Sequence, residues 1–147
     1  MEAQWAQTYR LVNKIRHHRE EILRYEAVGL EDAEVIAVAY GAASRTVKTG
    51  VLEARRRGVK AGFLRLISLW PFADELFERD ARYLVCELNY DGQLVREVMR
   101  AAPDKRKVHF MGKSAELHTV AEVAAALEGV ARRDRIPELP YIWTEVR

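Results

Sequence analysis

Short apolar runs alternate with helix-like segments along most of the chain. "EVIAVAY" at residues 34–40 is an almost continuous apolar run, and further runs follow at 59–68, 82–88 and 107–112. Segments with helical periodicity or helix-start signals separate these runs. Buried strands that alternate with helices over short connections are typical of βαβ units, which form a parallel sheet covered on both faces. We therefore predict a three-layer α/β/α protein with a mostly parallel sheet.

The N-terminal segment follows a different pattern. Apolar and aromatic residues recur close to helical spacing as far as Tyr25, and the first glycine of the chain is Gly29, which supplies a stop signal. We predict a helical arm over residues 1–29, an α/β domain over 30–131 and an extended, proline-containing tail over 132–147.

Composition excludes several classes of function. The 147 residues include 24 basic and 22 acidic side chains, and the formal net charge of +2 gives no electrostatic reason to expect nucleic acid or an anionic membrane as partner. No window approaches the roughly 18 apolar residues of a membrane span, and the N-terminus does not resemble a signal peptide, so we expect a cytoplasmic protein. The single cysteine, Cys86, forbids an internal disulfide or a cysteine-ligated iron–sulfur cluster; because it lies in an apolar run, we interpret it as a buried hydrophobe.

No complete catalytic or metal-binding motif is present. The turn after residues 34–40 lacks the G-x-G-x-x-G pattern, and neither a phosphate loop nor a G-x-S-x-G elbow occurs elsewhere. His17 and His18 are adjacent on the expected helix and therefore point about 100° apart, which prevents them from chelating one ion. We assign no catalytic residue and no metal ligand to this chain.

Two turns at strand ends carry polar residues with more than one interpretation. Ser44 is favoured as the N-cap of the helix that follows residues 34–40, but Ala42, Ser44 and Arg45 could instead bind an anion at that helix N-terminus. In the turn at residues 89–93, we favour Asp91 as a helix cap over a metal ligand.

Aromatic residues collect at the expected strand ends. Trp70, Pro71 and Phe72 follow one strand, and Tyr40 and Tyr90 end or follow two others. The carboxyl ends of parallel strands meet at one edge of a sheet, where α/β proteins bind ligands and partners. Monomers seldom expose an aromatic patch of this kind, and aromatic side chains dominate the energetics of interfaces. We therefore predict that the Trp-Pro-Phe segment faces another domain or subunit.

Taken in order, these motifs resemble domain II of the alpha subunit of 2-oxoacid:ferredoxin oxidoreductases, a domain similar in fold to the C-terminal domain of transketolase. The resemblance is strong over residues 30–101 and weaker beyond. It rests on Tyr40-Gly41, Gly58-Val59-Lys60, Gly62, Leu64-Arg65, Trp70-Pro71-Phe72, Glu87, Asn89, Gly92 and Gln93.

The resemblance implies oxidative decarboxylation of a 2-oxoacid to an acyl-CoA, dependent on thiamine diphosphate, with ferredoxin as electron acceptor. The family's thiamine diphosphate signature begins Gly-Asp-Gly, whereas Tyr90 precedes Asp91-Gly92 here. One cysteine cannot hold an iron–sulfur cluster. We therefore expect thiamine diphosphate, Mg²⁺ and the iron–sulfur clusters elsewhere in the complex, and no catalysis by this chain alone.

The predicted function is a non-catalytic assembly domain. Its partners would be the pyrimidine-binding domain of the alpha subunit and the other subunits, with ferredoxin and coenzyme A acting on the whole complex. In isolation, exposed Trp70 and Phe72 could make the domain a homodimer. The alternative is a module that binds a nucleotide or coenzyme A phosphate at residues 41–45. The predicted interface consists of Tyr40, Gly41, Trp70, Pro71, Phe72, Glu87, Asn89, Tyr90 and Gln93.

Overall fold

The computed structural model describes residues 2–114, 116–132 and 142–143. A six-stranded sheet with the strand order β1-β3-β2-β4-β5-β6 lies at its centre. The four middle strands run parallel, whereas β1 and β6 pair antiparallel at the two edges. The predicted α/β class with a mostly parallel sheet is confirmed. The strands are β1 (Tyr25–Val28), β2 (Val35–Tyr40), β3 (Ala61–Leu66), β4 (Arg82–Glu87), β5 (Val108–Gly112) and β6 (Ile142–Trp143).

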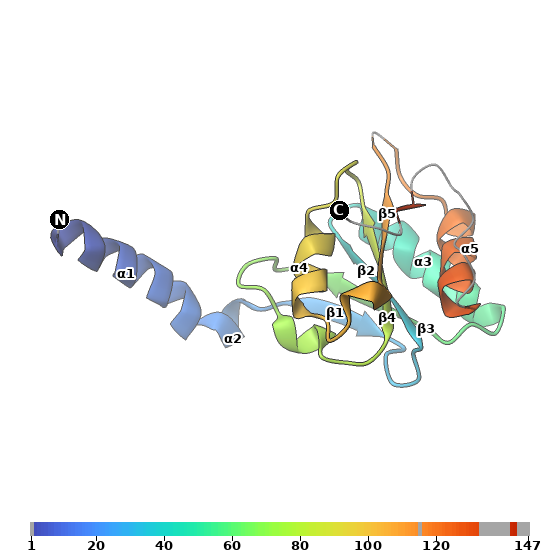
Figure 1. Ribbon diagram of the computed structural model, residues 1–147, viewed down its shortest axis with the longest axis horizontal. Coiled ribbons are helices and arrows are strands. Elements are labelled where there is room, and N and C mark those ends of the chain that lie inside the picture. The colour runs from blue at the N-terminus through green and yellow to red at the C-terminus, as the bar shows by residue number, and fades with distance from the viewer. Residues whose placement is uncertain (1, 115, 133–141, 144–147) are drawn as a thin grey trace.

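Helices cover both faces of the sheet and give the expected three layers (Figure 1). α3 and α5 pack together on one face, and α4 lies with the 3-10 helix η1 on the other. In β2, Val35, Ala37 and Ala39 belong to the first core and Ile36 and Val38 to the second, which explains the continuous apolar run. The helices are α1 (Glu2–His17), α2 (Arg19–Ile22), α3 (Ala43–Arg56), η1 (Asp74–Phe77), α4 (Leu94–Ala101), η2 (Lys105–Lys107) and α5 (Val120–Arg132).

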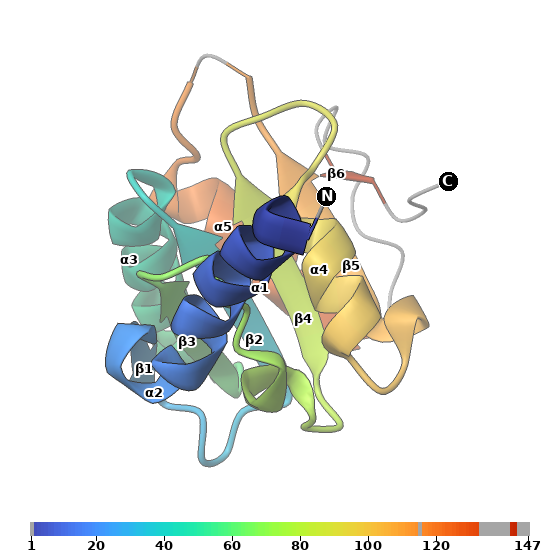
Figure 2. The ribbon, with the colours of Figure 1, turned by 90° about the vertical axis from the view of Figure 1, so that its left-hand side faces the viewer.

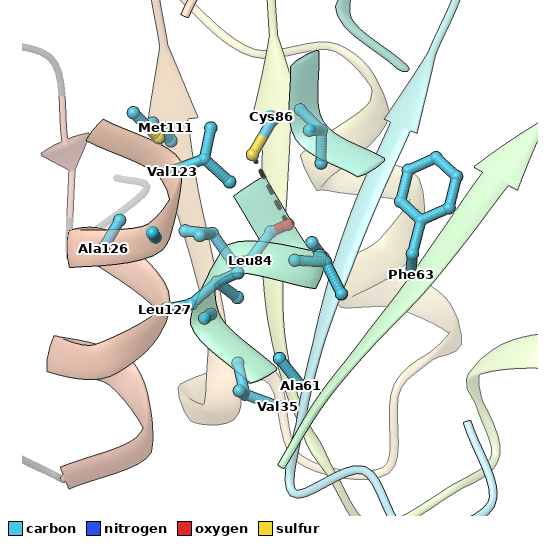
Figure 3. Packing of buried hydrophobic residues seen from close by; sticks show 14 of the residues in the cluster. Val35, Ala61, Phe63, Leu84, Cys86, Met111, Val123, Ala126 and Leu127 are labelled. Carbon is cyan, nitrogen blue, oxygen red and sulfur yellow. Dashed lines mark hydrogen bonds between the residues drawn. The ribbon is translucent and has the colours of Figure 1, made fainter. Parts of the chain in front are cut away.

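The core between the sheet and the α3–α5 pair contains the cysteine (Figure 3). Cys86 is fully buried on β4, in a cluster that includes Met111 of β5 and Val123 of α5. Burial raises the pKa of its thiol, so the side chain stays protonated and acts as a small apolar group. The interpretation of Cys86 as a buried hydrophobe is confirmed.

The helical arm is shorter than predicted. α1 projects from the domain (Figure 1), but the helical segment ends at Ile22 rather than near Gly29. Residues Tyr25–Val28 form strand β1, in which Tyr25 lies opposite Leu66 of β3. The expectation of helix in this stretch is wrong because the open edge of β3 offers backbone hydrogen bonds that local periodicity does not reveal.

The segment after β3 also differs from the prediction. β3 ends at Leu66 rather than at residue 68, and the helix expected between this strand and the next is a single 3-10 turn at Asp74–Phe77. The predicted C-terminal tail lies mostly outside the described residues; within it, Ile142–Trp143 pairs with β5. Among the helices that the structure describes, none combines the length and apolar character needed to cross a membrane.

Candidate functional site

The Trp-Pro-Phe segment is divided between the core and the surface. Phe72 is only 7% exposed; its ring stacks on Phe77 with the centroids 5.3 Å apart, and the guanidinium of Arg100 lies 5.6 Å from its centroid. Pro71 is buried as well, whereas Trp70 is 68% exposed. The expectation that Phe72 is exposed is therefore wrong: Phe72 closes one end of the core, and Trp70 presents an aromatic surface.

Exposed apolar side chains accumulate on the loops at the carboxyl ends of β3, β4 and β5. Six such residues form what we call the carboxyl-edge surface, with exposed fractions that range from 37% for Leu88 to 68% for Trp70. All three loops lie at the same edge because these strands are parallel. The carboxyl-edge surface consists of Ile67, Leu69, Trp70, Leu88, Tyr90 and Leu117.

A pocket of about 310 Å³ opens at this edge. From β2 the chain crosses to β3 on one side of the sheet, and from β4 it crosses to β5 on the other, so the space beyond β2 and β4 is a topological switch point. The pocket brings together three of the predicted interface residues, Tyr40, Phe72 and Gln93. Its full lining is Tyr40, Leu69, Phe72, Gln93, Leu94 and Glu97.

Glu87 organises the turn between β4 and α4 and does not reach the surface. Its side chain is fully buried. Oε2 accepts hydrogen bonds from the backbone amides of Gln93 and Leu94, both 3.0 Å long, and from Asn89 Nδ2 at 2.8 Å. Oε1 accepts one from the amide of Val95 at 2.9 Å. An acidic side chain from the preceding strand thus caps the N-terminus of α4.

The predicted cap, Asp91, is not the cap of α4. Its Oδ2 instead accepts from Arg96 at 2.6 Å, in an exposed ion pair. Asn89 holds the turn through its Oδ1, which accepts from the amide of Gly92 at 2.6 Å. The prediction failed because Glu87 lies six residues before Gln93, beyond the spacing of local capping patterns. The available signal was the set of family motif residues Glu87, Asn89, Gly92 and Gln93, since all four take part in this network.

Sequence reasoning also missed a polar cluster beside this turn. His118 is 2% exposed, and its Nε2 lies 3.2 Å from the backbone oxygen of Glu87. Burial lowers the pKa of His118, and the contact with that oxygen opposes the shift. Lys113 donates to Glu122 at 3.2 Å, and Glu122 in turn accepts from the amide of Thr119 at 2.7 Å as part of a capping box for α5.

The turn after β2 does not contain the predicted Ser44 cap. The N-cap of α3 is Ala42, which makes no side-chain capping hydrogen bond, and Ser44 lies within the helix. Ser44 is 3% exposed, and its Oγ has no hydrogen-bond partner among the described residues. Gly41 and Arg45 are exposed on either side of it.

The donor atoms present do not fit the cofactors that the family implies. Among the residues that the structure describes, no group of three or more His, Cys, Asp or Glu side chains could hold a metal ion. The oxygens of Glu87 are occupied by hydrogen bonds, and Asp91 is paired with Arg96. The only thiol, on Cys86, is buried. Neither a Mg²⁺–diphosphate site nor an iron–sulfur cluster matches this donor set.

The fold and the edge geometry define a doubly wound α/β domain with a pocket and exposed apolar side chains at the carboxyl ends of its strands. The family model for the core domain II of pyruvate:ferredoxin oxidoreductase matches residues 33–130. The chain belongs to this family and is a domain of a 2-oxoacid:ferredoxin oxidoreductase subunit.

Similar proteins are subunits of larger enzymes. The chain is 39% identical over 123 residues to the 2-oxoglutarate synthase subunit KorA of Methanocaldococcus jannaschii, a match that covers 82% of this chain and 33% of the relative. It is 35% identical over 127 residues to the ketoisovalerate oxidoreductase subunit VorB of Methanothermobacter thermautotrophicus, covering 81% and 36%. The chain thus spans about a third of the length of these curated relatives.

A solved structure shows the same fold. It is the 2-oxoglutarate:ferredoxin oxidoreductase from Magnetococcus marinus with 2-oxoglutarate, coenzyme A and succinyl-CoA bound. The TM-score is 0.74 at 17% sequence identity, and the match covers 89% of this chain and 24% of the other. The similarity confirms the predicted fold.

Proposed function

We propose that this chain is the non-catalytic assembly domain of the alpha subunit of a 2-oxoacid:ferredoxin oxidoreductase. The complete enzyme would convert a 2-oxoacid and coenzyme A to an acyl-CoA and pass electrons to ferredoxin. Thiamine diphosphate, Mg²⁺ and the iron–sulfur clusters would be held by its other domains and subunits. The role of this chain is to pack against the pyrimidine-binding domain and the neighbouring subunits.

The carboxyl-edge surface is the observation that carries this proposal. Six large apolar side chains are exposed on loops at one edge, beside a pocket whose lining includes Leu69, Phe72 and Leu94. Such a surface is costly in water, and exposed aromatic residues such as Trp70 are the side chains that anchor protein interfaces. Because the relatives are about three times as long as the matched segment, they contain the polypeptide that can cover this surface.

Replacement of Trp70 tests the proposal. The chain and its Trp70→Ala variant are each co-expressed with the remaining domains and subunits of the oxidoreductase from the same genome. Loss of an exposed aromatic anchor should weaken association by about tenfold or more while leaving the fold intact. Isothermal titration calorimetry or sedimentation measures the affinity, and circular dichroism checks the fold.

Leu52→Ala is the matched control. Leu52 is an exposed apolar residue, at 41%, that lies on α3 and outside the carboxyl-edge surface. Its replacement should leave association unchanged. Equal affinities of the Trp70→Ala variant and the unmodified chain would show that Trp70 is not part of the interface.

A second candidate function is anion binding at the turn formed by Ala42, Ser44 and Arg45. It is favoured by the hydroxyl of Ser44 near the N-terminus of α3, which has no hydrogen-bond partner among the described residues. The ligand would be the phosphate of coenzyme A or a nucleotide. Calorimetry with coenzyme A and with ATP tests it: saturable binding that Arg45→Ala weakens would support this function. Absence of heat at millimolar ligand would rule it out for the chain alone.

A further inference from the structure

The N-terminal helix α1 carries an apolar stripe that the described part of the chain leaves uncovered. Trp5, Tyr9 and Val12 follow the i, i+4, i+7 spacing of one helix face and are 73%, 70% and 38% exposed. No residue of α1 is buried. Figure 1 shows the helix standing clear of the domain; in Figure 2 the viewer looks toward the end of the arm, and α1 is drawn in front of the domain. We call these three residues the arm stripe.

An isolated helix of this length is marginal in water, because nucleation is costly and most helical stability in proteins comes from packing an apolar face. α1 has 16 residues and gains no such packing from the described residues. Trp and Tyr are also the side chains most enriched at the centres of interfaces. A helix of this composition is therefore stabilised when a partner covers the arm stripe.

The root of the arm is bonded to the segment that carries Trp70. Arg19 of α2 donates to the backbone oxygen of Phe72 at 3.0 Å and to Glu75 Oε2 at 2.5 Å. Ser68 Oγ donates to the backbone oxygen of Ile22 at 2.6 Å. These bonds attach α2 to the loop after β3. The arm therefore begins at the carboxyl-edge surface, and a partner seated on that surface also lies next to α1.

The charge of α1 defines the chemistry of its partner. The helix contains three basic residues, Arg10, Lys14 and Arg16, and one acidic residue, Glu2. None of the three basic residues forms an ion pair within the described part of the chain. A groove that fits α1 is apolar at its base and acidic at its rim. A second copy of α1 fits less well because the two helices carry the same net positive charge.

We infer that the arm stripe docks in an apolar groove with an acidic rim on the part of the oxidoreductase subunit that lies outside this chain. This inference rests on the proposed function and adds a second contact to it. Such a groove could lie in the part of the relatives that this chain does not match, since about two-thirds of the KorA relative lies beyond the matched segment. The partner would therefore contact this chain at two places, the arm stripe on α1 and the carboxyl-edge surface.

Hydrogen exchange on the complex tests the inference separately from the proposed function. The full chain is compared alone and bound to the remaining domains and subunits, and exchange is followed at residues 2–17, 67–72 and 88–93. Docking of both surfaces should slow exchange in all three segments by at least about tenfold. Protection at 67–72 and 88–93 without protection at 2–17 would overturn the inference and leave the proposed function standing. Failure of any complex to form would overturn both.

Two variants sharpen the test. The double replacement Trp5→Ala/Tyr9→Ala should weaken association about tenfold or more, whereas Gln7→Ala, on the opposite face of the same helix, should not. Both variants should fold, because no residue of α1 is buried. Protection of residues 2–17 that rises with the concentration of the chain alone, or appears on adding anionic phospholipid vesicles, would assign the stripe to a second copy or to lipid and overturn the inference.

Discussion

Four hydrogen bonds converge on the side chain of Glu87, at the point where β4 turns into α4. We expect Glu87→Gln to lower the free energy of unfolding by about 2–3 kcal/mol, because an amide group would oppose backbone N–H donors that have no other partner. The replacement keeps the shape of the side chain, so a loss of stability reports on hydrogen bonding and on the charge at the N-terminus of α4 rather than on packing. Urea unfolding followed by circular dichroism measures it.

Asp91→Asn is the matched control for this prediction. It makes the same chemical change in the same turn, but the side chain of Asp91 is 82% exposed and forms a surface ion pair with Arg96. The expected change is within about 0.5 kcal/mol. Similar losses in both variants would mean that Glu87 does not have the capping role that its contacts indicate.

For single residues, the sequence identifies the members of a structural motif more readily than it identifies the structural role of each member. The pattern at 87–93 was recognisable, and Glu87, Asn89 and Gln93 do form one unit. Their role as a buried cap was missed, because a strand residue reaches the amides of a following helix only through the path of the folded turn. Burial likewise decides between Trp70 and Phe72, two neighbouring aromatic residues that a pattern cannot tell apart.

The elements show a similar division. The apolar runs of β2, β3, β4 and β5 were predictable because strands covered on both faces must be apolar throughout. β1 was not: Tyr25–Val28 extends a helical pattern and becomes a strand only because β3 offers an unpaired edge. Tertiary pairing of this kind overrides local propensity.

Packing of α3 on α5 depends on Gly50. A Cβ at this position would lie 2.6 Å from Cβ of Val123 on α5, closer than real contacts allow. Gly50→Ala gains roughly 1 kcal/mol of helix propensity, but overpacking costs about 1–3 kcal/mol. We therefore expect a net loss of stability of about 1 kcal/mol, measured by thermal or urea unfolding.

Thr49→Ala provides the comparison. Thr49 is exposed on α3, where its Oγ1 donates to the backbone oxygen of Arg45, so helix propensity decides the outcome. The free energy of unfolding of the Thr49→Ala variant should stay within about 0.5 kcal/mol of that of the unmodified chain. A Gly50→Ala variant more stable than the unmodified chain would mean that α5 can shift to accept the methyl group.

For the molecule as a whole, α1 and the α/β domain are continuous in sequence, but α1 should contribute little to the free energy of unfolding of the domain. The domain's cores lie around the sheet, and α1 contributes nothing to either of them. The boundary that separates them in stability falls between α1 and β1, because β1 is part of the sheet. A boundary at residue 29, as the sequence suggested, would cut away a paired strand.

Two truncations locate this boundary. Deletion of residues 1–17 should change the free energy of unfolding by less than about 0.5 kcal/mol, since no buried contact is lost. Deletion of residues 1–29 should cost at least about 3 kcal/mol, because it removes the hydrogen bonds between β1 and β3 and the ion pair of Glu26 with Lys48. Urea unfolding of both variants decides the matter: equal stabilities would place the boundary at residue 29, and a loss confined to the longer deletion would place β1 within the folded domain.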